Sequence, residues 1–497
     1  MARRNRLGID FLVLLAGQAM MVLQGIIVLP FVIKLAGEAT YGAYVLLLSL
    51  VGWLFSLLGC GIPYRYQRSL VSTASFKERR ELFEPQFTFQ IVVVAGISAA
   101  AILVGNRFET WLFGGAAYFS VWLFVIYLFV RLANKQGLDY FQYTQRFLPL
   151  SLTLSGNPYL FVALLALVAF GHKHLTLDTL LALQIVSTAA ISLPILSILV
   201  REIGIPRLRL PLGLLISDTK LGLPLMLELT IDFLLRSSDR YLILAFLSVA
   251  DVGIYQPAYT VGSLAIFFVT LTETILLPTL SRLVDAGERD VAQDLTTMFQ
   301  RLFVIVGVPM VVGSLLMGPS LIGLLTTPAI GLASAWVTPL IALATVFYGI
   351  ARLASTVAYV LRRTMLILWA NLAGAGVTIG LNLILLPLLH SITASGFAAA
   401  AGQLVNCLYV LLALRSVWRF PVNLSATIRC CGAAGVMAGV LLALGFRPGD
   451  VSSSGVASLA VDLALAIPAY FGALLLLGGI RQRDWIQLMN LASRRFD

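Results

Sequence analysis

Charged residues are scarce in this sequence: Asp, Glu, Lys and Arg make up 11% of its 497 residues. Soluble domains usually contain about 25% charged residues. Hydrophobic residues account for 59% of the chain, and the mean hydropathy is +0.95. So few polar side chains cannot cover so much apolar surface in water, and the chain must lie in lipid. The composition therefore predicts an all-α polytopic membrane protein and excludes a soluble fold.

Residues that form disulfides, metal sites and nucleotide sites are also few. The four cysteines lie within or at the ends of apolar segments without CxxC spacing, which indicates buried thiols. His172 and His174 share one short link, which is a weak pattern for a metal site. No GxxxxGK(S/T) loop is present to bind ATP. We therefore expect neither a metal nor a cofactor, and if transport is ion-coupled, the expected ion is a proton or Na+.

Long apolar runs separated by short links extend over the whole chain. About 20 apolar residues are enough to cross a bilayer as a helix. The run after the basic start MARRNRLGIDFLVLL is too long for a signal peptide, so we expect an uncleaved first helix. The sequence predicts fourteen spans, at residues 10–35, 40–62, 86–106, 112–131, 148–170, 177–200, 221–247, 252–278, 302–325, 336–359, 366–389, 393–414, 427–446 and 455–480.

The distribution of Lys and Arg gives these spans a direction. With the N-terminus in the cytoplasm, 27 of the 34 Lys and Arg residues fall in cytoplasmic segments, 4 in outer links and 3 inside spans. This bias follows the positive-inside rule, so both termini are expected in the cytoplasm. The net charge of +11 then reflects topology and contact with anionic membrane lipids, and we expect no nucleic-acid partner.

Two similar stretches occur six predicted helices apart. LAGEATYGAY leads into the second span, and FLSVADVGIY leads into the eighth. The matching pairs are Gly42 with Gly253 and Tyr44 with Tyr255. At the far ends of these spans, GIPYRYQRSL and LLPTLSRL each contain a proline followed by an arginine, Arg65 and Arg282. Parallel repeats of this kind build two lobes around a central site in several transporters.

The repeat divides the chain into four parts. Residues 1–200 form an N-terminal six-helix lobe, and residues 201–220 form a cytoplasmic linker between the lobes. Residues 221–415 form a C-terminal six-helix lobe, and residues 416–497 contain helices 13 and 14 with a cytoplasmic tail. The links between the predicted spans are all short, so no inserted soluble domain is expected.

The seventh predicted span carries an unusual row of charges. LELTIDFLLRSSDR, residues 227–240, has charged residues at intervals of four, and Asp239 lies beside them. The members of the row are Glu228, Asp232, Arg236 and Arg240. This spacing places them along one side of a helix, which should face the protein interior because a charge in the bilayer is costly without water or a partner.

Two interpretations of this row are open. It is either an ion-pair ladder that neutralises itself, or a binding surface on which Arg236 and Arg240 hold a pyrophosphate or an acidic sugar. The planar guanidinium suits phosphate oxygens and stays charged at any relevant pH. Glu228 and Asp232 are also candidates to carry a coupling proton or cation.

Other candidate residues lie on the following spans. Glu273 and Arg352 are charges inside spans, and Glu273 is expected to pair with the seventh helix because consecutive helices are usually neighbours. Tyr255 and Tyr259 are candidates to stack on sugar rings. Arg65 and Arg282 either capture a pyrophosphate at the cytoplasmic surface or serve only as determinants of topology.

Four segments resemble the polysaccharide-export flippases, the O-antigen and exopolysaccharide branch of the multidrug/oligosaccharidyl-lipid/polysaccharide exporter superfamily. They are LAGEATYGAYVLL, LLGCGIPYRYQRSL, SSDRYLILAFLSVADVGIYQPAYTVGSL and LLPTLSRLVDAGERDVAQDL. The resemblance implies two six-helix bundles that face each other across a cavity lined by helices 1, 2, 7 and 8. It also implies alternating access, in which a lipid-linked oligosaccharide of the undecaprenyl-pyrophosphate type crosses the bacterial cytoplasmic (inner) membrane.

Three other functions remain open. Cation-coupled multidrug exporters of the same superfamily typically carry an acid in the first helix, and lipid II flippases typically carry arginines there. This chain has Gln18 and Gln24 in that helix and no charge in its middle. A membrane polysaccharide polymerase usually needs a sizeable outer loop, whereas the outer links here are short. The sequence therefore favours a transporter over an enzyme, with glycosyltransferases or a polymerase as its partners in export.

Overall fold

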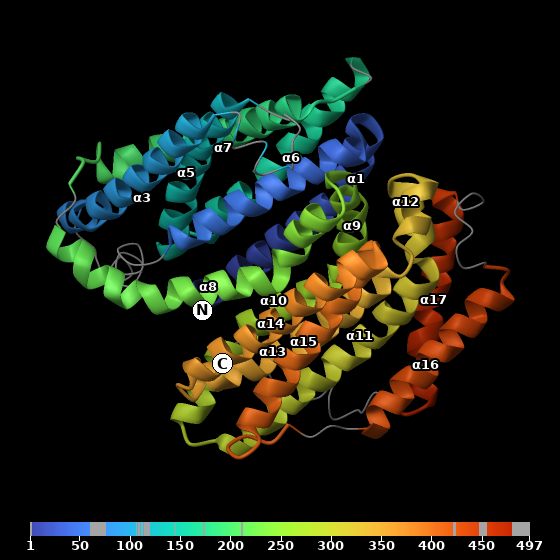
Figure 1. Cartoon of the computed structure of the whole chain (residues 1–497). Helices are drawn as coiled ribbons and strands as arrows, with labels where there is room; N and C mark the ends of the chain where they lie inside the picture. The colour runs from blue at the N-terminus through green and yellow to red at the C-terminus, as the bar shows by residue number, and fades with distance from the viewer. Residues whose placement is uncertain are drawn as a thin grey trace. The chain divides into compact units, whose positions relative to one another are not determined.

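The computed structural model describes residues 2–59, 76–105, 107, 110, 113, 120–144, 146–171, 174–209, 212–420, 424–446 and 455–479. Every regular element among them is helical, as predicted. The chain falls into two compact units, Met1–Gly253 and Ile254–Asp497 (Figure 1). The predicted lobe and linker boundaries at residues 200, 220 and 415 stay a prediction.

The first unit consists of long helices joined by short links. Its helices are α1 (Ala2–Leu57), α3 (Phe76–Val104), α5 (Val121–Tyr143), α6 (Phe147–Gly171), α7 (Leu177–Ile203) and α8 (Leu212–Phe246). The boundary between the units falls within α9 (Val249–Gly262). Helix α1 is bent at Gly37, whose φ of 79° is accessible to glycine at no steric cost, and this bend separates the first two predicted spans.

The second unit contains the remaining helices. They are η1 (Ser263–Ala265), α10 (Ile266–Asp285), α11 (Arg289–Leu325), α12 (Pro328–Ala333), α13 (Val337–Val360), α14 (Thr364–Leu389), α15 (Ile392–Leu414), α16 (Leu424–Ala443) and α17 (Val456–Leu476). Helix α13 packs against α10, α11 and α15, and α15 packs against α14. Helices α16 and α17 pack on α11, where the buried Tyr470 hydroxyl donates to the Ile305 carbonyl at 2.8 Å (Figure 1).

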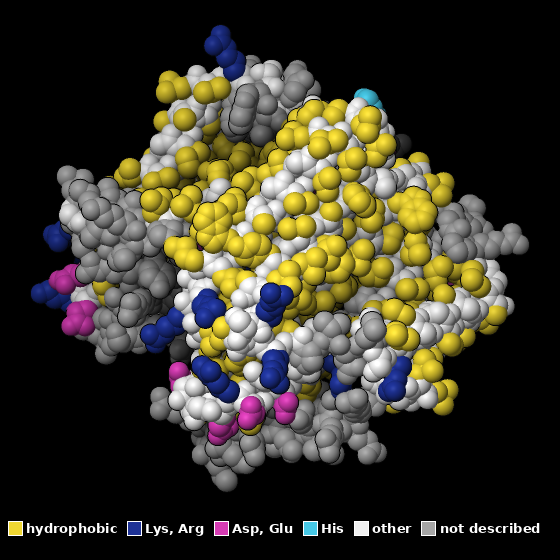
Figure 2. All heavy atoms as spheres, turned by 60° about the horizontal axis from the view of Figure 1, so that its bottom comes forward, with side chains coloured by type: hydrophobic (Ala, Val, Ile, Leu, Met, Phe, Trp, Pro, Cys, Tyr) yellow, Lys and Arg dark blue, Asp and Glu magenta, His cyan; other side chains and the backbone are white. Residues whose placement is uncertain are grey.

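Twelve helical segments among the described residues are long and apolar enough to cross a membrane. The difference from fourteen lies in α1, which contains two predicted spans, and in α8, which is long enough but carries the charged row. Figure 2 shows hydrophobic side chains over much of one face, with Lys and Arg mainly toward its lower part. A polytopic helical membrane protein is thus confirmed, whereas the count of fourteen and the side of each terminus stay predictions.

One predicted span lies closer to the N-terminus than the helix that the structure shows. The sequence predicts residues 112–131, but α5 extends over Val121–Tyr143. The polar stretch NKQGLD (134–139) does not look like membrane helix in the sequence, yet Asn134, Gln136 and Asp139 are all buried. Packing against other helices explains why these buried polar residues are tolerated. Helix α5 lies against α3 and α7, whose side chains cover this polar stretch.

The glycines of the sequence repeat touch each other within the first unit. A Cβ added to Gly42 would overlap the carbonyl oxygen of Val249, and a Cβ added to Gly253 would overlap that of Glu38. Each glycine thus contacts the residue four positions before the other. Such a reciprocal contact is what a two-fold axis between equivalent segments produces. It supports the alignment of the two repeats on these glycines.

We predict that Gly42→Ala and Gly253→Ala each lower the free energy of unfolding by about 1–3 kcal/mol, because the added methyl meets rigid backbone. The matched control is Gly52→Ala, also in α1, where an added Cβ has no neighbour within 4 Å. The control should keep or gain stability, by up to about 1 kcal/mol from helix propensity. Thermal unfolding of the purified protein in detergent measures all three, and equal stability of Gly42→Ala and Gly52→Ala would contradict the close backbone contact.

Candidate functional site on α8

The predicted row of charges lies on α8, as its spacing requires. The side chains of Asp232 and Arg236 are 27% and 38% exposed, whereas those of Asp239 and Arg240 are 4% and 7% exposed. Glu228 is half-buried. The row therefore divides into an accessible part around Asp232 and Arg236 and a buried part around Asp239 and Arg240.

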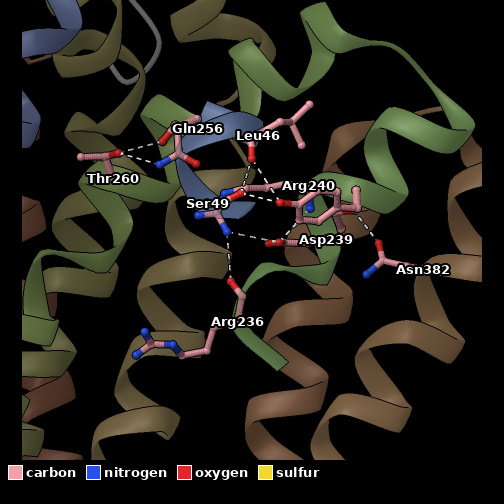
Figure 3. A network of polar contacts seen from close by, with 10 residues as sticks. Leu46, Ser49, Arg236, Asp239, Arg240, Gln256, Thr260 and Asn382 are labelled. Carbon is pink, nitrogen blue, oxygen red and sulfur yellow. Dashed lines mark hydrogen bonds and ion pairs between the residues drawn. The ribbon is translucent and has the colours of Figure 1, made fainter. Parts of the chain in front are cut away.

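The accessible part is an ion pair between one acid and one base of the row. Arg236 Nε lies 3.5 Å from Asp232 Oδ2, one turn away on the same helix. An acid placed four residues before a base is the favourable order for such a pair. Figure 3 shows the Arg236 guanidinium directed away from Asp239 and Arg240. Its partial exposure leaves the guanidinium accessible to an anionic ligand.

The buried part is a compact structural network. Arg240 Nη1 donates to the Arg236 carbonyl at 3.1 Å and lies 3.5 Å from Asp239 Oδ1 (Figure 3). Asp239 Oδ1 also accepts the Arg240 backbone N–H at 2.9 Å. Two opposite charges that share hydrogen bonds can be buried together at far lower cost than either alone. Arg240 is therefore engaged within its own helix, and its predicted contact with substrate stays a prediction.

Helix α8 is held in place by the part of α1 that follows the bend at Gly37. The Tyr241 hydroxyl lies 2.8 Å from Ser49 Oγ and donates to the Leu46 carbonyl at 3.2 Å. The rings of Phe233 and Trp53 stack with centroids 5.5 Å apart. These contacts fix the rotation of α8, and with it the direction in which Asp232 and Arg236 point.

A second ion pair lies in the second unit. Arg352 Nε on α13 donates to Glu273 Oε1 on α10 at 2.5 Å, and the two side chains are 27% and 30% exposed. Glu273 was expected to pair with the seventh helix, so that expectation is corrected. The physical reason is that α10 packs directly against α13, which places an opposite charge closer to Glu273.

The remaining predicted residues are spread over other elements. Tyr255 is fully buried, and its ring lies 6.1 Å from that of Tyr259, which is half-buried. Arg282 is exposed in the last turn of α10. Arg65 lies outside the described residues. The structure thus pairs Asp232 with Arg236, Asp239 with Arg240, Glu273 with Arg352 and Tyr255 with Tyr259.

A buried polar network between α3 and α5 was not predicted. Gln136 donates to Gln90 at 2.5 Å, and Gln90 donates to the Leu58 carbonyl at the end of α1 at 2.7 Å. On α5, Lys135 Nζ lies 3.1 Å from the buried Asp139 Oδ2. The predicted spans 112–131 and 148–170 place Lys135 in a cytoplasmic link between them. The four-residue spacing of Lys135 and Asp139 is the signal that could have placed both on one helix.

No group of three or more His, Cys, Asp or Glu side chains among the described residues has the arrangement of a metal site. Several charged groups in the same part of the chain occur instead as pairs of opposite sign, such as Asp232–Arg236 and Glu273–Arg352. Pairs of this kind suit the binding of an organic or phosphate anion by exchange of partners better than the binding of a divalent cation.

A family model described as "Polysaccharide biosynthesis protein" matches residues 7–284 of the chain. No curated protein matches the chain in a sequence comparison. Among solved structures, the lipid II flippase MurJ in an inward closed conformation has a TM-score of 0.73 and 14% identity. That alignment covers 96% of this chain and 99% of MurJ.

Two MATE transporters are also similar in structure. An inward-facing multidrug resistance MATE family transporter of the MOP superfamily has a TM-score of 0.64 and 13% identity, over 80% of this chain and 94% of its own. A mutant of the Vibrio cholerae MATE transporter VcmN has a TM-score of 0.57 and 15% identity, over 84% of this chain and 99% of its own. At these identities the similarity establishes a shared fold.

The two parts of the row should respond differently to the loss of an arginine. Arg240→Ala leaves a buried carboxylate without its guanidinium, and we predict a loss of about 3–5 kcal/mol in the free energy of unfolding. Arg236→Ala removes a half-exposed pair, and we predict a loss of about 0–1 kcal/mol. Thermal unfolding in detergent compares the two variants.

Adding Asp239→Asn to Arg240→Ala serves as the control for this comparison, because it removes the unpaired charge and should restore part of the lost stability. Equal losses for Arg236→Ala and Arg240→Ala would contradict the division of the row into an accessible and a buried part.

Proposed function

Because the chain belongs to the polysaccharide biosynthesis protein family, we propose that it is a flippase for a lipid-linked oligosaccharide of the undecaprenyl-pyrophosphate type. It would turn this lipid across the bacterial cytoplasmic membrane by alternating access during the synthesis of a cell-surface polysaccharide. The observation that carries the proposal is the half-exposed Asp232–Arg236 pair in α8, a helix of a membrane protein that is long enough to cross the bilayer. A charge is kept in such a place when it has a function there.

Arg236 is the proposed contact for the pyrophosphate. Its planar guanidinium forms two parallel hydrogen bonds with phosphate oxygens, and such charge-assisted bonds are about twice as strong as neutral ones. Both side chains of the Asp232–Arg236 pair are partly exposed, so a phosphate can approach the guanidinium and take the place of the carboxylate. Substrate binding would thus replace one anion by another at the same guanidinium.

This exchange suggests how transport is coupled to an ion. When a phosphate binds Arg236 in place of Asp232, the Asp232 carboxylate loses its counter-charge. A proton or Na+ would then neutralise Asp232, and Glu228 lies one turn before it on the same helix. The ion would be released when the substrate leaves and the Asp232–Arg236 pair forms again.

The Glu273–Arg352 pair is proposed to act in the same way. It also joins a half-exposed guanidinium to a carboxylate, between α10 and α13 of the second unit. Arg65 and Arg282 would receive the lipid at the cytoplasmic surface, and Tyr259 would contact its sugars. Tyr255 is buried, so its contact with sugar requires that neighbouring side chains move. Glycosyltransferases and a polymerase would supply the substrate and consume the product.

Two related functions have structural support and need to be separated by experiment. The similarity to MurJ over 96% of this chain favours lipid II as the substrate, and lipid II carries the same pyrophosphate. The similarity to MATE transporters favours a cation-coupled drug exporter. Both are second to the proposed function because the middle of the first predicted span has neither the arginines nor the acid typical of those proteins.

The first test replaces Arg236 by Ala and by Lys. We predict that each variant lowers surface polysaccharide by about 10-fold or more, since one charge-assisted contact is worth about 1.5–3 kcal/mol. Lysine should not restore export, because its ammonium cannot bind phosphate in the bidentate geometry of a guanidinium. Surface polysaccharide is quantified on whole cells, together with the amount of folded protein in the membrane.

Arg289→Ala is the matched control, since Arg289 is an exposed arginine at the start of α11, and it should leave export unchanged. If the protein level falls with export and Asp232→Ala combined with Arg236→Ala restores both, the pair is structural and the proposed site is wrong. Loss of cell viability with intact surface polysaccharide would favour lipid II, and drug sensitivity alone would favour a drug exporter.

A further inference from the structure

A short extended segment joins α7 to α8. We call residues 204–209, GIPRLR, the strap. Helix α7 ends at Ile203 because Gly204 adopts a φ of 80°, and the Gly204 N–H donates to the Val200 carbonyl at 2.8 Å. Pro206 follows and prevents a new helical turn from forming at once. The strap leads, after residues 210 and 211, directly into the helix that carries Asp232 and Arg236.

The backbone of the strap is bound to the first turns of α3. The Arg207 N–H donates to Glu84 Oε1 at 3.1 Å, and the Arg209 N–H donates to Thr88 Oγ1 at 2.9 Å. The Ile205 carbonyl accepts from Arg80 Nη2 at 2.8 Å. Alternate residues are thus paired along one edge, as in a strand at the edge of a sheet. The backbone N–H and C=O groups on this edge of the strap therefore have hydrogen-bond partners within the protein.

Most side chains of the strap are exposed. Ile205 and Leu208 are 74% and 68% exposed, and the Arg209 side chain is 63% exposed. Arg207 is exposed as well. Glu84 is buried and already paired with Arg80 at 2.8 Å, whereas Arg209 Nε lies 3.9 Å from it. The strap therefore displays two large apolar side chains next to an excess of positive charge.

We propose that the strap is a docking surface for anionic lipid headgroups in the leaflet that the Lys and Arg distribution predicts to be cytoplasmic. Non-helical backbone is tolerated at the edge of a bilayer only when its polar groups are paired within the protein, and α3 provides that pairing. Ile205 and Leu208 enter the interface, and Arg207 and Arg209 bind lipid phosphates.

The neighbouring surface supports a lipid as the occupant. Just before the strap, α7 exposes Leu193 and Val200, at 66% and 42%, in a helix apolar enough to cross the membrane. The strap continues this apolar surface and adds cations at its end, which complements a layer of anionic headgroups. The consequence is that the start of α8 is tied to one leaflet. This inference rests on the chain crossing a membrane and does not depend on the substrate.

The experiment uses the full chain with its four cysteines replaced by serine and Leu208→Cys labelled with an environment-sensitive fluorophore. The protein is placed in phosphatidylcholine vesicles with or without phosphatidylglycerol. We expect a blue-shifted emission and quenching by lipids that carry a nitroxide near the headgroup. That quenching should be about twofold or more stronger with phosphatidylglycerol, because each arginine favours the anionic surface.

Arg207→Gln combined with Arg209→Gln should remove the effect of phosphatidylglycerol. Both substitutions keep the backbone N–H groups that bind α3, so the strap stays in place. The matched control is Arg362→Gln with Arg363→Gln, two exposed arginines in the turn before α14, and it should keep the effect. Quenching by aqueous iodide but not by nitroxide lipids would overturn the proposal and indicate a water-facing strap. A phosphatidylglycerol effect that survives in the strap variant would also overturn it.

Discussion

The structure depends on one constraint, which is that a polar group placed among apolar helices must have a partner within the protein. Asp239 and Arg240 satisfy each other within one helix, and Gln90 on α3 donates to the Leu58 carbonyl just after α1. Arg352 finds its carboxylate on another helix of the same unit. The partners that lie on different helices favour particular helix neighbours, because apolar side chains alone make lipid and protein equally good neighbours.

The same constraint explains which helices the sequence predicts correctly and which it misplaces. Helix existence follows from apolar runs, and most described helices lie where those runs are. The exception is α5, whose stretch 134–139 looks like a loop until the helices that cover it are known. The bend at Gly37 is local in origin, and the two predicted spans on either side of it are both helical.

The candidate site was predictable in its residues but not in their roles. A spacing of four residues is enough to place Asp232, Arg236 and Arg240 on one side of α8. Sequence spacing cannot tell which arginine turns toward its own backbone, because that depends on Asp239 and on the aromatic contacts with α1. The partner of Glu273 was missed for a related reason, since the nearest helix in sequence was not the one that supplies the nearest charge.

Helix α8 combines these features in one continuous element. Its C-terminal part is held to α1 by Tyr241, beside the buried Asp239–Arg240 network of α8 itself. Its start follows a strap whose backbone is bound by α3. Between these two attachments lies Asp232–Arg236, the more exposed of the two ion pairs of the row. A helix fixed at both ends can change most easily by exchanging partners at its middle, because that exchange breaks the fewest buried contacts. The position of the accessible pair is therefore the position at which a bound anion would perturb α8 at the least cost.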